Sequence, residues 1–401
     1  MAMRRRLVLT RLPEPERRRV AETYDTIVIG VGGMGAAACY HLARRGSRVL
    51  GLERFDVPHN RGSSHGTTRI IRLAYFENPA YVPLARRALE LWKETEKAFG
   101  EQLYFRTGGI DAAPEDHYVF RGALESCRAH DLPHKVLSAE DANRRFPGYR
   151  LPAMHLALYQ ADGGFIASER AILAHVTLAH AAGARIHCRE RVLEWQPVAG
   201  GGVRVATDRG SYEAGRLIVS AGAWVGELVP QLRTLAVPER QVLGWFQPAE
   251  PKLFRPDVFP VVIAVGNDGL YYATPIWGVP GLKIGLYHHR GESGPAEGLS
   301  REVGPEDEAP LRAGARSFFK DADGPLMAMK TCLFTNTPDG HFIIDALPGH
   351  PEIIVASPCS GHGYKFASAI GEILADLARD GKTRADMSLF GLGRFAEQAA
   401  G

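Results

Sequence analysis

Three glycines and a glutamate near the start of the chain have the spacing of a dinucleotide-binding motif. Gly30, Gly32 and Gly35 follow the pattern G-x-G-x-x-G, and Glu53 comes about twenty residues later. Such glycines let the backbone approach a pyrophosphate, whose charge the free amides of a helix N-terminus stabilise. The glutamate can accept hydrogen bonds from a ribose diol. The pattern therefore predicts NAD or FAD rather than NADP.

The segments around these residues have the patterns of a strand, a helix and a second strand. Thr26–Ile29 and Arg48–Leu52 are short, largely apolar runs, which predict buried strands, and Ala36–Arg45 between them predicts a helix. Further buried strands are predicted at Leu217–Val219 and Glu352–Ala356. Nucleotide-binding elements are thus expected at the start, in the middle and at the end of the chain.

Two intervals between these elements are rich in strand-like sequence, which predicts two interleaved domains. A chain of 401 residues also exceeds one typical hydrophobic core. We expect a Rossmann-type α/β domain interleaved with a smaller antiparallel-sheet domain. The expected boundaries are 24–104, 160–238 and 328–396 for the nucleotide domain, 105–159 and 239–327 for the second domain, and 1–23 for a flexible N-terminal extension.

Charge and cysteine content narrow the class of protein. The chain has 48 basic and 45 acidic side chains and a formal net charge of +3, which is too balanced to favour nucleic acid or a membrane surface. Apolar runs fall short of membrane-spanning length. Five scattered cysteines without a CxxC pair indicate a reducing compartment, and hence a cytoplasmic protein without a disulfide framework. No metal site is predicted.

Seven segments between Tyr24 and about Phe395 together resemble one known family. They are GVGGMG, GSSHGTTRIIR, ADGGF, LIVSAGAW, GLYYATP, KTCLFTNTPDGHFIID and SGHGYKFASAIGEILADLA. This set is similar to the monomeric sarcosine oxidase family, which includes N-methyltryptophan oxidase and pipecolate oxidase. The resemblance implies a glutathione-reductase-like FAD fold with a smaller antiparallel sheet covering the flavin. It also implies FAD linked through its 8α-methyl group to a cysteine sulfur, at the position of Cys332.

The resemblance implies roles for five polar side chains. Arg72 and Lys365 match the pair that holds the substrate carboxylate, and Arg69 matches a residue beside the flavin, which Lys365 is also expected to touch. Because the two arginines are three residues apart, they would share a face on a helical turn. Lys283 matches a lysine that promotes reaction with oxygen, where a fixed ammonium stabilises developing superoxide. Tyr272 matches a tyrosine of the substrate pocket.

Further cofactor contacts are expected from the GSSHGTTRIIR loop and from later segments. His65 is expected beside the flavin, and the hydroxyls of Ser64 and Thr68 can hydrogen-bond FAD phosphates or the ring. Val192 and Gly361 complete the predicted cofactor-binding residues.

Two positions depart from the family pattern. The family has a histidine four residues after the lysine that Lys283 matches, whereas this chain has Tyr287 there, followed by His288 and His289. Either a one-residue bulge places His288 in the site, as the candidate active-site histidine, or Tyr287 replaces it. Phe334 stands where sarcosine oxidases often carry tyrosine, which should make the pocket more apolar and admit larger substrates.

The expected activity is flavin-dependent oxidation of a secondary-amine amino acid, such as sarcosine, to an imine. O₂ would be reduced to hydrogen peroxide, and hydrolysis of an N-methyl imine would release formaldehyde. Alternatives are a larger N-methyl or cyclic substrate, a dehydrogenase, and a non-catalytic flavin-binding subunit, which Cys332, Lys283 and Lys365 together disfavour. The segment SGHGYKF disfavours a NAD-dependent enzyme. The resemblance also implies a monomer.

Overall fold

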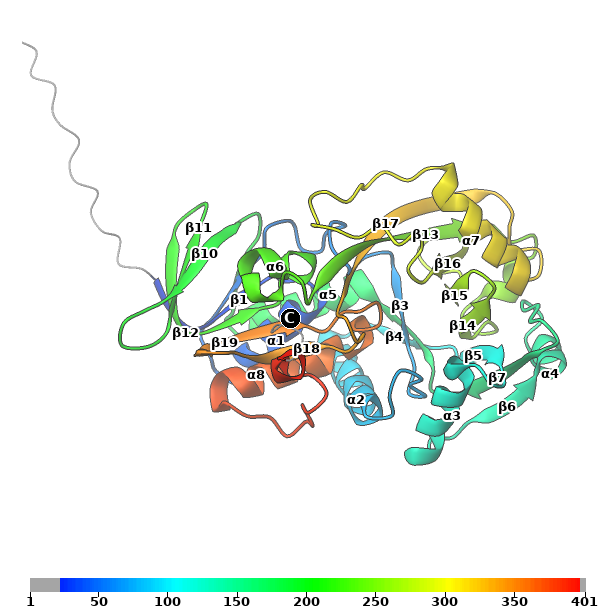
Figure 1. Ribbon diagram of the computed structural model, residues 1–401, viewed down its shortest axis with the longest axis horizontal. Coiled ribbons are helices and arrows are strands. Elements are labelled where there is room, and N and C mark those ends of the chain that lie inside the picture. Colours follow the sequence, from blue (N-terminus) through cyan, green and yellow to red (C-terminus); the bar gives the residue numbers. More distant parts are fainter. Residues whose placement is uncertain (1–21, 397–401) are drawn as a thin grey trace, which may run out of the picture.

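The computed structural model describes residues 22–396, which form two eight-stranded sheets and a three-stranded sheet (Figure 1). The predicted N-terminal extension therefore lies outside the described residues, apart from Glu22 and Thr23, which begin β1. No helix between residues 22 and 396 is long and apolar enough to cross a membrane.

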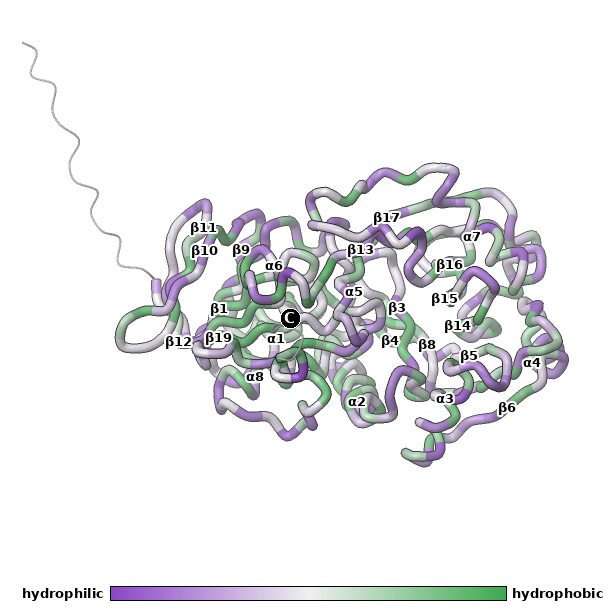
Figure 2. Tube along the Cα trace, viewed as in Figure 1, coloured by the Kyte–Doolittle hydropathy of each residue, from purple (hydrophilic) through white to green (hydrophobic). Residues whose placement is uncertain are grey.

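The first sheet contains the dinucleotide-binding motif. Five of its strands run parallel, in the order β9 (Arg185–His187), β2 (Val49–Leu52), β1 (Glu22–Ile29), β12 (Ser211–Val219) and β19 (His350–Ser357). Antiparallel strands extend it: β18 (Ile343–Leu347) beside β19, and β10 (Val192–Pro197) and β11 (Val203–Thr207) beside β12. The central strands are nearly continuous apolar runs, as expected for parallel strands covered on both faces (Figure 2).

Helices cover one face of the first sheet. Four of them pack together there: α1 (Gly33–Ala43), α2 (Tyr81–Phe99), α5 (Ser168–Ala181) and α8 (Ala367–Asp380). The short helix α6 (Val225–Leu228) contributes to the apolar cluster on the other face. This arrangement confirms the predicted Rossmann-type α/β fold of this part of the chain.

The second sheet is antiparallel except between β14 and β5. Its order is β17 (Leu326–Asn336), β13 (Val237–Phe246), β16 (Leu282–Leu286), β15 (Gly269–Thr274), β14 (Val261–Gly266), β5 (Gly109–Pro114), β7 (His155–Gln160) and β6 (Lys135–Ser138). The helices α4 (Ala139–Arg145) and α7 (Pro305–Phe318) pack against one face with an aromatic-rich core, and α3 (Tyr118–Ala129) packs beside β5 and β7.

One strand falls on the other side of an expected boundary. We expected the nucleotide domain to resume at residue 328, but β17 pairs along its length with β13 of the second sheet. Cys332 therefore belongs to the second sheet. The small third sheet consists of β3 (Thr68–Ile71), β8 (Gly164–Ala167) and β4 (Tyr104–Arg106). Its strands lie in the segments of the chain that connect the two large sheets.

Candidate active site

The glycine-rich loop forms a compact turn at the carboxyl end of β1. Gly30 has a φ of 86°, and a Cβ atom on Gly35 would lie 1.8 Å from the carbonyl oxygen of Gly30, so neither position accepts a side chain. Gly32, at the N-cap position of α1, has no side chain with which to cap the helix, and the first turn holds no acidic residue. Apart from the Gly33 amide, which donates to Ser64, the amides of the first turn are therefore available to an anion.

Glu53 and Ser64 lie at either side of this loop. The buried Glu53 carboxylate accepts hydrogen bonds from the backbone amides of Val31 and Phe55, both at 2.9 Å. The hydroxyl of Ser64 accepts a hydrogen bond from the amide of Gly33 at 3.2 Å. These bonds fix the acid and the hydroxyl beside the glycine-rich loop.

A continuous cavity leads from this loop to the second sheet. It brings together most of the residues predicted from the sequence. They are Gly30, Gly32, Glu53, Ser64, Thr68, Arg69, Arg72, Val192, Tyr272, Lys283, Cys332, Gly361 and Lys365. Gly35, His65 and His288 do not line the cavity.

Cross-strand register determines which side chains of the second sheet face the cavity. Tyr272 pairs with Ile263 on one side and with Gly285 on the other, and directly paired residues point to the same face of a sheet. A Cβ atom on Gly285 would lie 2.2 Å from the Tyr272 ring, so the ring rests directly on this glycine. In the next row Lys283 pairs with Thr274. The regular ladder thus aims Tyr272 and Lys283 into one cavity.

Arg72 follows β3, and its guanidinium is buried against an acid. Its Nη2 donates to both carboxylate oxygens of Glu77, at 2.7 and 2.9 Å, and its Nη1 donates to the carbonyl of Ala74 at 2.6 Å. Burial opposes the charge, but Glu77 and then Asp111 raise the pKa of Arg72 above its ordinary value. Burial alone would raise the pKa of Glu77, but Arg72 and neighbouring cations lower it. The pair is therefore ionised, and an incoming carboxylate must compete with Glu77.

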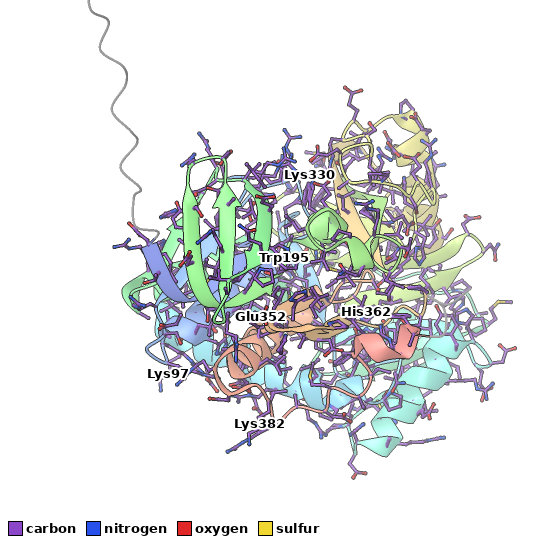
Figure 3. The ribbon with its side chains drawn as sticks, turned by 60° about the vertical axis from the view of Figure 1, so that its left-hand side comes forward. Lys97, Trp195, Lys330, Glu352, His362 and Lys382 are labelled. Atoms are coloured by element: carbon purple, nitrogen blue, oxygen red, sulfur yellow. The ribbon has the colours of Figure 1, made fainter. Side chains whose placement is uncertain are left out.

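Lys365 supplies the second positive group at this end of the cavity. Its Nζ donates to the carbonyl of His362 at 2.6 Å, and burial together with the nearby Arg72 lowers its pKa to about 7. The ring of His362 is held by the hydroxyl of Tyr75 at 2.5 Å, and burial lowers its pKa to about 4. The His362 side chain, labelled in Figure 3, is buried. Both side chains belong to the segment that follows β19.

Three cavity-region residues were missed by sequence reasoning. Glu77 and His362 line the cavity, and Asp111 lies 4.0 Å from the Nε of Arg72, where burial raises its pKa to about 7 against the effect of that arginine. His362 stands within the SGHG segment, so its motif was available as a signal. The only sequence signal for Glu77 was that it is an acid five residues after Arg72. No signal in the sequence indicated that Asp111 would lie near the site.

Lys283 is held rigidly in the cavity wall. Its Nζ donates to the carbonyl oxygens of Gly66 and Thr68, at 2.8 and 2.7 Å, and lies 3.0 Å from the Thr68 hydroxyl. The nitrogen also lies 5.7 Å from the centre of the Trp245 ring. Burial, with a further contribution from Arg69, lowers its pKa well below the ordinary value.

Cys332 and Arg69 meet in the same wall. The Arg69 Nη2 lies 3.7 Å from the Cys332 sulfur and donates to the carbonyl of Ser63 at 2.6 Å. The expected helical turn is wrong, because Thr68–Ile71 form the strand β3. Arg72 directly follows this strand, and residues three apart on extended backbone point to opposite sides. Arg69 reaches Cys332 while Arg72 reaches Glu77, and both side chains line the cavity.

His65 lies behind the cavity wall. Its side chain is buried, and neither ring nitrogen has a hydrogen-bond partner within residues 22–396. Burial first, and the charge of Arg69 second, lower its pKa to about 3, so the ring is neutral at physiological pH.

The placement of His288 in the site is wrong. Its side chain is 62% exposed and its Nδ1 bonds to Glu239 at 2.8 Å, outside the cavity. The strand β16 ends without the suggested bulge, so Tyr287 takes the inward position and packs against Phe334 with ring centres 5.1 Å apart. Both rings close on Gly361, where a Cβ atom would lie 2.7 Å from each. The second alternative, in which Tyr287 occupies the histidine position, therefore matches the structure.

The arrangement defines a class of protein. A dinucleotide-binding loop opens into a cavity whose far wall carries buried cations, aromatic rings and a thiol, as in oxidoreductases that hold a flavin dinucleotide. Glycines that exclude side chains, a helix N-terminus without an acidic residue in its first turn and a fixed acid at the end of β2 all fit FAD. In such a protein Gly32, Glu53 and Ser64 would hold the dinucleotide.

Comparison with known proteins identifies the family. A family model for FAD dependent oxidoreductases matches residues 25–377. Monomeric sarcosine oxidase from Streptomyces avermitilis is 40% identical over 386 residues, covering 95% of this chain and 100% of that protein. N-methyl-L-tryptophan oxidase from Salmonella dublin is 36% identical over 384 residues, covering 93% and 100%. The chain belongs to the FAD-dependent oxidoreductase family, which confirms the resemblance drawn from its motifs.

Solved structures show the same fold. The open form of NikD, an amino acid oxidase essential for nikkomycin biosynthesis, superposes with a TM-score of 0.81 at 27% identity, covering 92% of this chain and 97% of NikD. Glycine oxidase from Geobacillus kaustophilus gives a TM-score of 0.77 at 22% identity, covering 92% and 98%. The predicted fold class is confirmed.

Proposed function

We propose that this protein oxidises a secondary-amine amino acid, of which sarcosine is the smallest, with O₂ as the electron acceptor. The observation that carries the proposal is the pair Arg72 and Lys365, two basic groups buried at the end of the cavity that faces Tyr272. An amino acid bound there by its carboxylate would place its amine against an apolar, aromatic wall. The names of the relatives, which act on N-methyl amino acids, point to the same substrates.

In this proposal the two ends of the cavity bind different molecules. The first sheet holds FAD, and the second sheet provides the substrate wall. Arg72 and Lys365 bind the carboxylate in place of Glu77, through charge-assisted hydrogen bonds that fix the substrate's orientation. Tyr272 and Phe334 exclude water from the N-methyl group. When bound, FAD supplies the two-electron chemistry that oxidises the amine to an imine and reduces O₂ to hydrogen peroxide.

We assign the reaction with O₂ to Lys283. Its Nζ is fixed at the cavity wall by two carbonyl oxygens and one hydroxyl, so the side chain does not have to move during the reaction. In its ammonium form such a preorganised positive charge stabilises negative charge that develops on oxygen. After oxidation, hydrolysis of an N-methyl imine yields formaldehyde and the primary amino acid.

We further propose that FAD is attached through Cys332 and that the enzyme is a cytoplasmic monomer. The buried sulfur lies in the cavity wall, 3.7 Å from the Nη2 of Arg69, where a cofactor bound in the cavity would meet it. The monomer is supported by the names of the sarcosine oxidases to which the chain is similar.

A larger N-methyl or cyclic amino acid is the second candidate substrate. Tyr287 and Phe334 offer two aromatic rings beside Tyr272, whose ring meets that of Tyr287 nearly edge-on at 6.2 Å. Such a wall can pack against an indole or a six-membered ring. The 36% identity with an N-methyl-L-tryptophan oxidase favours the same view.

The test is peroxide release, in air, when sarcosine, N-methyl-L-tryptophan or L-pipecolate is added to the purified yellow protein. Dimethylamine, which has a secondary amine but no carboxylate, is the matched control. We expect peroxide from at least one amino acid and none from dimethylamine. Anaerobic bleaching followed by slow reoxidation in air would instead indicate a dehydrogenase. Absence of flavin, or no bleaching with any amine, would refute the proposal.

A further inference from the structure

The loop between β16 and α7 crosses from the second sheet to the cofactor cavity. Ala296 within this loop is only 2% exposed and packs with Ala223 and Leu333. Figure 1 shows this loop, in yellow, running away from α7 and toward α6. Both residues that Ala296 contacts line the cavity, so the loop covers part of its wall.

Backbone bonds hold the base of this loop on the second sheet. The amide of Arg240 donates to the carbonyl of Glu292 at 2.8 Å, and the amide of Gly294 donates to the carbonyl of Pro238 at 3.0 Å. On the returning side, the Arg240 side chain donates to the carbonyl of Ser300 at 3.0 Å. Both ends of the loop are therefore anchored on the second sheet, and its middle extends from there to the cofactor cavity.

One carboxylate ties the middle of the loop to the first sheet. Glu297 lies 2.7 Å from the Nη1 of Arg54 and accepts a hydrogen bond from the indole nitrogen of Trp224 at 2.9 Å. The guanidinium of Arg54 also lies over the Trp224 ring, 5.8 Å from its centre. The bond from Trp224, and then the charge of Arg54, lower the pKa of Glu297, so the acid is ionised at neutral pH.

The two partners of Glu297 belong to the nucleotide end of the cavity. Arg54 directly follows Glu53, the acid placed to bind a ribose, and Trp224 follows the loop at the end of β12. A cofactor that lies along the cavity passes beside both side chains. The loop and its carboxylate therefore sit across the side of the cavity that the dinucleotide occupies.

We propose that Glu297 is a positioning residue of the cofactor site. It holds Arg54 and Trp224 at the nucleotide end of the cavity and keeps the loop over FAD. The contacts of Glu297 with Arg54 and Trp224 must therefore break before FAD can enter or leave. The inference depends on FAD binding alone and holds whatever amine the enzyme oxidises.

The size of the expected effect follows from exposure. The Glu297 side chain is 59% exposed and that of Arg54 is 28% exposed, so solvent weakens their attraction. Partly exposed ion pairs contribute up to about 1 kcal/mol, which corresponds to roughly a fivefold change in a rate or equilibrium constant. Glutamine at position 297 keeps an acceptor for Trp224 and loses only the charge. We therefore expect Glu297→Gln to raise the FAD release rate about two- to fivefold.

The experiment measures FAD release and rebinding by flavin fluorescence in a Cys332→Ser background, where FAD cannot be linked to that sulfur. Glu297→Gln is compared with Glu292→Gln, a control in the same loop whose carboxylate pairs with Arg290 at 3.3 Å and with Arg240 at 3.8 Å rather than with Arg54. We expect faster release only for Glu297→Gln, with the difference from the control shrinking as salt rises to about 1 M. Equal rates for the two variants at low salt would overturn the proposal.

A double-mutant cycle gives an independent answer. Arg54→Gln removes the other half of the ion pair, so adding Glu297→Gln to it should change FAD release less than Glu297→Gln does alone. Fully additive effects would show that the two side chains act separately and would also overturn the proposal. A purified protein without any FAD would refute FAD binding itself, which is a different failure.

Discussion

The contact between Arg72 and Glu77 predicts that removing a negative charge will tighten binding. Glu77 occupies both oxygen-binding positions on the Arg72 Nη2, at 2.7 and 2.9 Å, so a substrate carboxylate has to displace it. Glu77→Gln leaves a neutral amide, which keeps one acceptor for the guanidinium. Hydrogen bonds to charged groups are worth about 1.5–3 kcal/mol. Because part of the contact remains in the variant, we take the lower value of about 1.5 kcal/mol. A carboxylate ligand should then bind to Glu77→Gln about tenfold more tightly than to the parent protein.

Methoxyacetate is a suitable ligand because an ether oxygen replaces the amine, so the carboxylate binds without reaction. Its dissociation constant can be measured from the perturbation of the flavin spectrum. The matched control is Glu372→Gln, since Glu372 makes a similar two-point contact with Arg87, both bonds at 2.8 Å, away from the cavity. The control should leave the dissociation constant unchanged. Unchanged or weaker binding in Glu77→Gln would refute the assignment of Arg72 as the carboxylate site.

Three further outcomes follow from the structure. Cys332→Ser should leave flavin in the supernatant after acid precipitation, whereas Cys359→Ser should keep the pellet yellow as in the parent protein. Gly285→Ala should push the Tyr272 ring away and lower kcat/KM by about 100-fold, with FAD content unchanged, since small misplacements in an active site have effects of this order. Burial lowers the pKa of His175 to about 3. Its neutral form therefore stabilises the fold above pH 6.5, and this stability is lost as the pH falls toward 3, by about 2 kcal/mol at pH 5. Urea unfolding at pH 7 and pH 5 measures it, and His175→Asn should reduce the difference.

The nucleotide-binding half was predictable because its signals are local. The strand, glycine turn, helix and acid from Thr26 to Glu53 follow one another without interruption, so their chemistry depends on neighbours in sequence. The strands β12 and β19 were also predicted, since a parallel strand covered on both faces is a short apolar run. The expected domain of Cys332 was wrong, because no local signal in the sequence shows that β17 pairs with β13 of the second sheet.

The errors arose where tertiary pairing decides a side chain's direction. Arg69 and Arg72 are three residues apart, and a helical turn would have aimed them together. Pairing of β3 with β8 makes the segment a strand and sends them to opposite sides. The same applies at the end of β16, where the ladder with β15 keeps Tyr287 facing inward. His288 then falls outside, in a turn with a φ of 60°.

The charges that tune the site come from partners far apart in sequence, which is why motifs alone do not reveal them. Arg72 is recognisable from its loop, but its ionisation and availability depend on Glu77 and on Asp111, which β5 brings behind it. Burial, and then the charge of Arg72 from a distant part of the sequence, lower the pKa of Lys365. The aromatic wall at Tyr287 and Phe334 and the acids around Arg72 are the places where this chain would set its own substrate preference.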